Sequence, residues 1–118
     1  MDVILVTGGL NYADIETIRA ALEPFPAGTL VLHGGAMGAD SLAHDVAREQ
    51  RKHTAVVEYP GWLRAVGGPV RNRLMIEMAV AMRERGHRVV VLAFGGDRGT
   101  SDCLGAAEHE AMEIHRFD

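Results

Sequence analysis

Glycine-rich segments are the parts of this sequence whose residue types and spacing could do chemistry. They are Gly8-Gly9, Gly34-Gly35-Ala-Met-Gly38, Gly67-Gly68, and Gly95-Gly96-Asp-Arg-Gly99 with Thr100-Ser101-Asp102 directly after it. Glycine tolerates positive φ angles and lets a ligand approach backbone N–H groups closely. A helix that begins just after such a segment adds unpaired amides and the positive end of its dipole. The chemistry that these segments predict is the binding of a phosphate group.

The elements that must position these segments are short apolar strands followed by amphipathic helices. Strand-like runs occupy residues 3–7, 30–33, 55–59 and 89–94, and alternating polarity at 113–117 predicts a fifth strand at an edge. Helical spacing of apolar residues covers 14–22, 40–51 and 70–85, and a fourth helix is expected from about residue 101. This alternation predicts an α/β fold: a three-layer domain with a mainly parallel five-stranded sheet and helices on both faces.

The predicted topology brings the glycine-rich segments together, because each of them follows a strand. Right-handed crossovers between parallel strands place the strand-to-helix loops at the carboxyl edge of the sheet, where ligands of open α/β sheets generally bind. One glycine pair alone would indicate only a tight turn, whereas several at one edge indicate a site. We therefore expect a nucleotide or nucleotide-derived phosphate ligand there, bound by a single domain that takes up residues 1–118.

Composition and charge narrow the partners and the compartment. The net charge of −4 disfavours a general nucleic-acid binder, because affinity for a phosphate backbone normally needs a surplus of Lys and Arg. The single cysteine, Cys103, leaves no disulfide and no paired-cysteine metal site, which is typical of the reducing cytoplasm. The apolar runs are too short to span a bilayer. We expect a cytoplasmic protein with no membrane partner and no bound metal.

Two common phosphate-binding motifs do not occur in the glycine-rich segments. No Lys-Ser or Lys-Thr follows them, as a Walker loop requires, and Gly8-Gly9-Leu-Asn lacks the spacing of a dinucleotide-binding turn. Neither ATP-magnesium nor a nicotinamide cofactor is therefore predicted, and no cofactor is expected. Thr100 is placed to cap the fourth helix or to donate to a phosphate. Asp102 would lie in the first turn of that helix, where it suits the helix dipole or could bind ribose hydroxyls.

Three longer motifs occur in order along nearly the whole chain. They are Gly34-Gly-Ala-Met-Gly-Ala-Asp40, Trp62 followed by Gly68-Pro-Val-Arg-Asn-Arg-Leu-Met75, and Gly96-Asp-Arg-Gly-Thr-Ser-Asp102. With them the chain resembles the SLOG superfamily of Rossmann-like domains, which includes DprA and the Lonely Guy phosphoribohydrolases, and most closely its small YspA-type members. The resemblance implies a Rossmann-like fold and a nucleotide pocket formed by the three loops, with Arg71 and Arg73 near the phosphate.

The resemblance leaves the activity open between a binding or sensing module and an enzyme. Lonely Guy enzymes carry P-G-G-x-G-T-x-x-E, whose final Glu takes part in cleaving an N-glycosidic bond, and this chain has Cys103 at the position of that Glu. A binding module is our first hypothesis. The alternative is an N-glycosidase acting on nucleoside monophosphates, with Asp102, Asp40 or Glu77 as the catalytic carboxylate. A third hypothesis is a mediator that binds single-stranded DNA as in DprA, although Met37 stands where that family usually has Arg.

Some of these side chains have a structural as well as a ligand-binding interpretation. Trp62 could stack on a base or cap the core. Cys103 is expected to be a small buried residue rather than a nucleophile. Methionines recur at helical spacing in the third helix, which favours core packing or a surface where two chains pair as a homodimer; they are Met75, Met78 and Met82.

The predicted ligand site combines the loops with the first turns of the helices that follow them. Arginines in the first turn of a helix oppose its dipole unless an anion lies nearby, which favours phosphate contacts for Arg71 and Arg73. The residues expected to bind the ligand are Gly8, Gly9, Gly34, Gly35, Gly38, Asp40, Trp62, Arg71, Asn72, Arg73, Gly95, Gly96, Arg98, Gly99, Thr100, Ser101 and Asp102. The expected partners are a nucleotide-derived small molecule and a second copy of the chain.

Overall fold

Strands and helices alternate along the chain, as the sequence predicts. The computed structural model describes residues 1–58 and 67–118. Its elements are β1 (Asp2–Gly8), α1 (Ile15–Leu22), β2 (Leu30–His33), α2 (Ala39–Glu49), β3 (His53–Val56), α3 (Gly67–Glu84), β4 (Arg88–Phe94), α4 (Arg98–His109) and β5 (Glu113–Phe117). Among the described residues, every strand but the last is followed by one helix, which is the arrangement that a parallel sheet needs.

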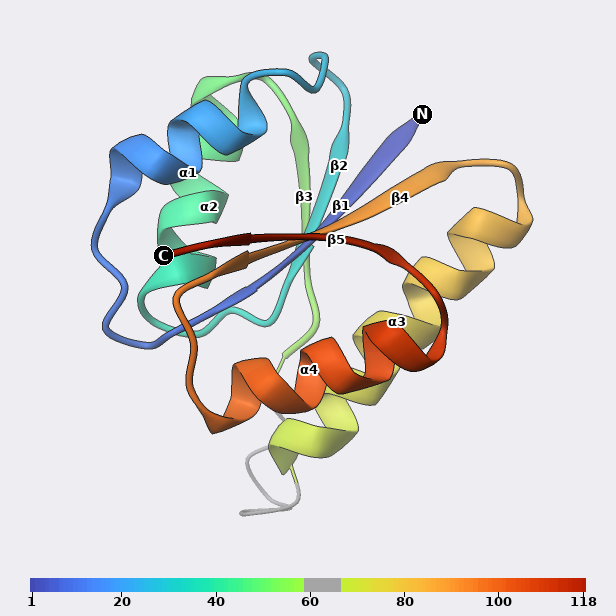
Figure 1. Ribbon diagram of the computed structural model, residues 1–118. Helices are drawn as coiled ribbons and strands as arrows, with labels where there is room; N and C mark the ends of the chain where they lie inside the picture. Colours follow the sequence, from blue (N-terminus) through green and yellow to red (C-terminus); the bar gives the residue numbers. More distant parts are fainter. Residues whose placement is uncertain (59–66) are drawn as a thin grey trace.

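The strands of the described residues form one parallel sheet in the order β3-β2-β1-β4-β5. In Figure 1, α1 and α2 cover one face of the sheet, and α3 and α4 cover the other. The predicted three-layer α/β fold is thereby confirmed. From β1 the chain proceeds outward to β3 on one side and later, through β4, to β5 on the other. The strand order thus reverses between β1 and β4, and such a switch point is where open α/β sheets bind ligands.

The strands carry apolar side chains on both faces of the sheet, and helices bury both faces. Side chains of a strand alternate between the two faces. Ile4 of β1 accordingly packs with Ile18 in the layer of α1 and α2, whereas Leu5 packs with Met75 in the layer of α3 and α4. Two apolar cores on either side of one sheet hold the strand ends, and the loops that follow them, in place.

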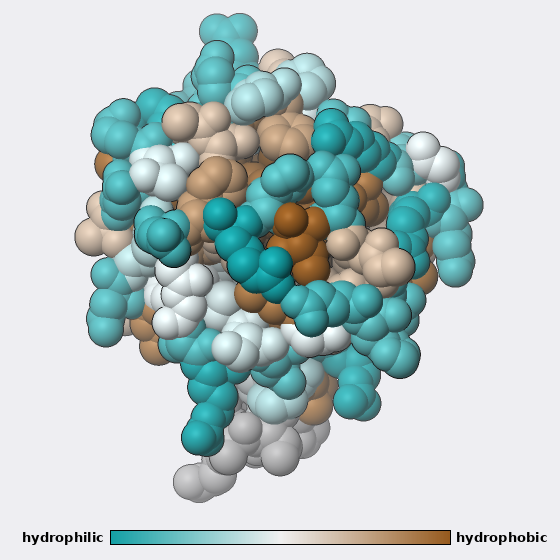
Figure 2. All heavy atoms as spheres, viewed as in Figure 1, coloured by the Kyte–Doolittle hydropathy of each residue, from teal (hydrophilic) through white to brown (hydrophobic). Residues whose placement is uncertain are grey.

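The outer strand β5 is protected by charged side chains. Figure 2 shows the face on which β5 lies in front in Figure 1, and it is mostly hydrophilic, with smaller apolar areas between the polar side chains. Arg88 donates to Glu113 at 3.1 Å, and His115 lies 2.7 Å from the same carboxylate. Arg116 pairs with Glu108. Charges of this kind discourage the pairing of an edge strand with another chain.

The helix starts nearest the carboxyl edge differ from the sequence prediction. α3 begins at Gly67 rather than at residue 70, and α4 begins at Arg98 rather than near 101. The cap of α4 is Asp97, whose carboxylate accepts hydrogen bonds from the backbone N–H of Thr100 at 2.9 Å and from its hydroxyl at 3.1 Å. Aspartate is a strong helix cap. Of the two roles predicted for Thr100, that of helix cap is therefore wrong, and that of phosphate donor stays a prediction. β3 also begins and ends earlier than expected, and residue 59 lies outside the described residues.

The methionines of α3 do not all join the core. Met75 is buried against the sheet, whereas Met78 is exposed beside Leu74 on the outer face of the helix, so the core interpretation is wrong for Met78. Pairing of two chains over this outer face stays a prediction. Neither α3 nor any other helix in the described parts of the chain is long and apolar enough to cross a membrane.

Candidate functional site

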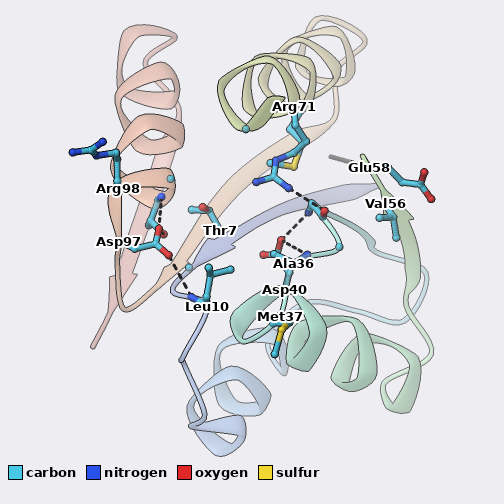
Figure 3. A pocket seen from close by; sticks show the side chains of 17 residues that line it. Thr7, Leu10, Ala36, Met37, Asp40, Val56, Glu58, Arg71, Asp97 and Arg98 are labelled. Carbon is cyan, nitrogen blue, oxygen red and sulfur yellow. Dashed lines mark hydrogen bonds between the residues drawn. The ribbon is translucent and has the colours of Figure 1, made fainter. Parts of the chain in front are cut away.

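A cavity of about 760 Å³ opens at the carboxyl edge of the sheet. Its walls come from the loops after β1, β2 and β4, the end of β3 and the start of α3 (Figure 3). The residues that line it are Thr7, Gly8, Leu10, Gly34, Gly35, Ala36, Met37, Asp40, Val56, Glu58, Gly68, Arg71, Met75, Asp97, Arg98, Gly99 and Thr100. The cavity includes the switch point between β1 and β4, which is where the topology predicts a ligand.

The loop after β2, residues 34–38, is held by a buried carboxylate, and we call it the Asp40 loop. Oδ2 of Asp40 accepts hydrogen bonds from the backbone N–H groups of Gly34 at 3.0 Å and Ala36 at 3.3 Å. Asp40 is only 5% exposed. Burial raises the pKa of this carboxyl above its ordinary value, although the two N–H groups and the nearby Arg71 act in the opposite direction. The loop therefore owes its shape to a carboxylate held in an unfavourable environment.

Two histidines hold the Asp40 loop from behind. Nδ1 of His33, at the end of β2, accepts a hydrogen bond from the backbone N–H of Gly35 at 3.0 Å. The proton of a neutral His33 is thus on Nε2, which donates to Nδ1 of His44 on α2 at 2.9 Å. Burial, together with repulsion from His44 and Arg71, lowers the pKa of His33 to about 4. Two histidines alone do not make a metal site. Within the described residues, no three His, Cys, Asp or Glu side chains are grouped so that they could hold a metal ion.

Arg71 reaches from α3 to the Asp40 loop. Its Nη1 donates to the carbonyl of Gly34 at 3.0 Å, and its Nε donates to Oδ1 of Asn72 at 2.9 Å. In Figure 3 the guanidinium is directed into the space between the loops, whereas Arg98 extends outward. A Cβ at Gly34 would overlap with the guanidinium. A side chain at Gly34 would therefore push the guanidinium out of this position.

Asn72 joins the starts of α3 and α4 behind the cavity. The side chain is buried, and its Nδ2 donates to Oδ2 of Asp102 at 2.9 Å and to the carbonyl of Gly99 at 3.2 Å. Its Oδ1 accepts the hydrogen bond from Arg71. Neither Asn72 nor Asp102 is among the residues that line the cavity. Their hydrogen bonds instead position Arg71 and the first turn of α4.

The loop after β4, residues 95–97, is held by a carboxylate on the surface, and we call it the Asp97 loop. Besides the bonds from Thr100 that cap α4, the carboxylate of Asp97 accepts a hydrogen bond from the backbone N–H of Leu10 at 3.4 Å. The hydrogen bonds from Thr100, first of all that of its backbone N–H, lower the pKa of Asp97 below its ordinary value. This ionised carboxylate connects the loop after β1 to the start of α4.

The structure brings one part of the predicted ligand residues together in the cavity. These residues come from the end of β1, the loop after β2, the start of α2, the second turn of α3 and the first turn of α4. They are Gly8, Gly34, Gly35, Asp40, Arg71, Arg98, Gly99 and Thr100.

Other predicted ligand residues lie outside the cavity. Glycines of the loops line two shallower hollows beside it, namely Gly9, Gly95 and Gly96 in one and Gly38 in the other. Arg73 and Glu77 are exposed on the outer face of α3, because residues two positions apart on a helix point in nearly opposite directions and Arg71 takes the inner face. Ser101 is exposed outside the lining. Trp62 lies outside the described residues.

Comparison with known proteins identifies the fold. No protein-family model and no curated protein matches the sequence. Among solved structures, the X-ray structure of DNA processing protein A (DprA) from Streptococcus pneumoniae matches with a TM-score of 0.56 and 16% sequence identity. The chain shares the Rossmann-like fold of DprA. The match covers 98% of this chain and 58% of the DprA chain, so the protein spans little more than half of DprA's length.

At this level of identity the likeness to DprA concerns the fold alone. It supports the Rossmann-like architecture that the three sequence motifs predict. The finer resemblance to YspA-type proteins stays a prediction, and so does the assignment of ligand residues.

Sequence reasoning missed several residues of the lining. Thr7 is the residue before the last of β1, Val56 ends β3, and Asp97 directly precedes a helix, so closeness to a strand end or to a helix cap could have indicated them. Leu10 and Met37 carry no such signal. An apolar loop residue can be recognised as exposed only in the folded chain.

Cys103 lies behind the cavity and does not line it. The side chain is fully buried in the core between α4 and the sheet, and burial raises the pKa of its thiol to about 11 even though a hydrogen bond with Thr7 acts in the opposite direction. A neutral thiol enclosed by apolar side chains is a poor nucleophile. The prediction of a small buried residue is therefore confirmed.

Proposed function

We propose that the cavity binds the phosphate group of a nucleotide or nucleotide-derived ligand, and that the protein holds or senses this ligand without cleaving it. The observation that carries the proposal is the guanidinium of Arg71, which two hydrogen bonds fix and which points into a cavity at the switch point of the sheet. A guanidinium has five N–H donors. The bonds to Gly34 and Asn72 use two of them, so others are available for phosphate oxygens.

The side of the cavity formed by α3 and α4 suits an anion better than the side formed by α2. α4 begins at Arg98, so the positive end of its dipole lies at Gly99 and Thr100, which line the cavity, but the carboxylate of Asp97 that caps Thr100 offsets part of this charge. The guanidinium of Arg71 is therefore the main attraction for an anion on this side. On the opposite side, the carboxylate of Asp40 would repel a phosphate. We therefore expect the phosphate beside Arg71.

Cleavage of an N-glycosidic bond is a second candidate function, and Asp40 is the residue that favours it. Of the three carboxylates that the sequence singles out, Asp40 alone lines the cavity, and its raised pKa would suit a proton donor. Asp102 accepts a hydrogen bond from Asn72, and Glu77 lies on the outer face of α3. Asp40 also fixes two backbone N–H groups of its own loop, a structural role that competes with catalysis. Binding without cleavage is therefore the first proposal.

Binding of a nucleic-acid strand is the weakest of the three candidate functions. The structural relative is named as a DNA processing protein, but the match covers only 58% of its chain. A shared fold over part of a protein does not carry the function of the whole protein. In this chain, Asp97 and Glu58 place negative charge at the cavity rim, and the net charge is −4. A polyanion would meet repulsion there that a single phosphate group beside Arg71 avoids.

Thermal unfolding with a nucleotide panel tests the first proposal. We expect nucleoside monophosphates, cyclic nucleotides or ADP-ribose at millimolar concentration to raise the melting temperature, because a ligand of the native state stabilises it. Arg71→Gln should lower the affinity roughly tenfold or more, since a charge-assisted hydrogen bond contributes about 1.5–3 kcal/mol. Arg73→Gln is the matched control, because it removes the same charge from the outer face of α3 and should leave the shift unchanged.

Chromatography of the same incubations separates binding from cleavage. We expect no free base after incubation with any nucleoside monophosphate. Release of base that Asp40→Asn abolishes would replace the first proposal with the second. If no member of the panel raises the melting temperature and soaked crystals show the loops without nucleotide, the phosphate site is wrong.

A further inference from the structure

Three large apolar side chains are exposed around the candidate cavity. Leu10 is 56% exposed, Met37 is 78% exposed and Val56 is 45% exposed, and all three line the cavity. Within the described residues, the other large apolar side chains with comparable exposure are Met1 at the terminus and Val70, Leu74 and Met78 on the outer face of α3. Apolar surface gathered at a cavity is typical of a place that a ligand covers.

These apolar side chains come from separate segments that only the fold brings together. Leu10 is in the loop after β1, Met37 is in the Asp40 loop and Val56 ends β3. Figure 3 shows them along the lower and outer sides of the cavity, whereas Arg71 enters from α3 above. The cavity thus has a cationic side next to α3 and an apolar rim formed by the loops after β1 and β2 and by the end of β3.

A ligand that matches both sides has an anionic group at one end and a flat apolar group at the other. Resting on the phosphate site proposed above, we propose that Leu10, Met37 and Val56 bind the face of a nucleobase while the phosphate lies at Arg71. The faces of a base are apolar, and a thioether such as that of Met37 makes favourable contacts with an aromatic ring. Flexible apolar side chains adapt to any base, so affinity should follow the area of the ring system rather than its hydrogen-bonding edge.

The proposal makes the base, and not only the phosphate, a determinant of affinity. A purine nucleotide should bind most tightly, a pyrimidine nucleotide less tightly, and ribose 5-phosphate, which has the phosphate but no base, at least about tenfold more weakly than AMP. A site that recognises phosphate and sugar alone would bind all three equally.

Isothermal titration calorimetry of the full chain with AMP and with ribose 5-phosphate tests the base contact. The double variant Leu10→Ser, Met37→Ser should weaken AMP about tenfold and leave ribose 5-phosphate unchanged. Leu74→Ser is the matched control, because Leu74 is 45% exposed on the outer face of α3 and should affect neither ligand. Arg71→Gln should weaken both ligands. Thermal unfolding of each variant without ligand verifies that it folds.

The possible outcomes separate this inference from the proposed function. Equal binding of AMP and ribose 5-phosphate, or an equal loss of both in the double variant, overturns the base contact and leaves the phosphate site standing. Loss of neither ligand in the double variant overturns it as well, and a change in the sedimentation coefficient with the same variant would assign the apolar rim to a second chain instead. If neither ligand binds the unmodified protein, the phosphate site and the base contact both fall.

Discussion

The Asp40 loop and the Asp97 loop are both glycine-rich connections from a strand to a helix, yet they are stabilised in opposite ways. A buried carboxylate, a buried histidine and an arginine hold the backbone of the Asp40 loop from the interior. In the Asp97 loop, a carboxylate on the surface caps α4, and the backbone N–H of Gly95 donates to the carbonyl of Phe117 at 2.8 Å. Burial raises the pKa of Asp40, whereas hydrogen bonds lower the pKa of Asp97.

The glycines of the two loops serve different purposes: Gly38 in the Asp40 loop and Gly95 in the Asp97 loop, with φ 75° and 65°, are needed for backbone shape, whereas Gly96 is not. Gly38 of the Asp40 loop has φ 75° and ψ −126°, a conformation for glycine, and a Cβ there would overlap with the carbonyl oxygens of Gly9 and Leu10. In the Asp97 loop, a Cβ at Gly96 would meet nothing within 4 Å. The Asp40 loop is therefore a fixed wall of the cavity, whereas the Asp97 loop is open at Gly96.

The largest expected effect compares these two glycines. Gly38→Ala should reduce the free energy of unfolding by about 4 kcal/mol, because it combines an unfavourable φ with overlap against backbone atoms that cannot move aside. Gly96→Ala should change it by no more than about 0.5 kcal/mol. Denaturant unfolding of both variants measures the difference. Equal stability of the two would show that the Asp40 loop adjusts to a side chain and is not a fixed wall.

The next effect concerns pH and the histidine behind the Asp40 loop. The folded pKa of His33, about 4, lies below the ordinary value of 6.5. The folded chain therefore binds fewer protons than the unfolded chain in this range, and the stability that comes from neutral His33 is complete above about pH 6.5 and is lost as the pH falls toward 4. A shift of this size corresponds to up to about 3 kcal/mol.

Unfolding curves at several pH values between 7 and 4 check this prediction. His33→Gln should flatten the dependence of stability on pH in this range. His53→Gln is the control, because His53 is an exposed histidine on β3, and this variant should keep the slope of the unmodified protein. If both variants keep the pH dependence of the unmodified protein, neutral His33 does not stabilise the Asp40 loop.

The smallest of the three effects compares the two carboxylates. Asp40→Ala leaves the backbone N–H groups of Gly34 and Ala36 without their partner and should lower the free energy of unfolding by about 3 kcal/mol. Asp97→Ala removes a helix cap and should lower it by about 1 kcal/mol. Calorimetric melting of both variants gives the difference of about 2 kcal/mol. A larger loss for Asp97→Ala would reverse the comparison of the two loops.

The sequence could predict the fold because the local signals agree with one another. Continuous apolar runs require a sheet buried on both faces, and the alternating polarity of residues 113–117 indicates the edge strand that β5 forms. The helix starts were less predictable. The start of α4 depends on which of two possible capping residues, Asp97 or Thr100, takes that position, and the capping geometry decides between them.

The site was only partly predictable, for a geometric reason. The spacing of Arg71 and Arg73 requires them to point in nearly opposite directions, but which of them faces the sheet depends on how α3 packs. The support of the Asp40 loop by His33 and His44 joins residues whose contact exists only after α2 has docked on the sheet. Glycine positions, by contrast, follow from backbone conformation alone, and many of them do line the cavity or the hollows beside it.

The position of β1 also dictates an order of events while the chain folds. The register places Val3 beside Leu30 on one side of β1 and beside Val89 on the other. During synthesis β1 can pair with β2 early, but its second edge stays unpaired until most of the chain has emerged, and the later closure is slower because it spans a longer loop. An unpaired strand edge attracts other chains. Premature association should therefore begin at β1, and the cavity, which needs β1 and β4 side by side, is among the last features to form.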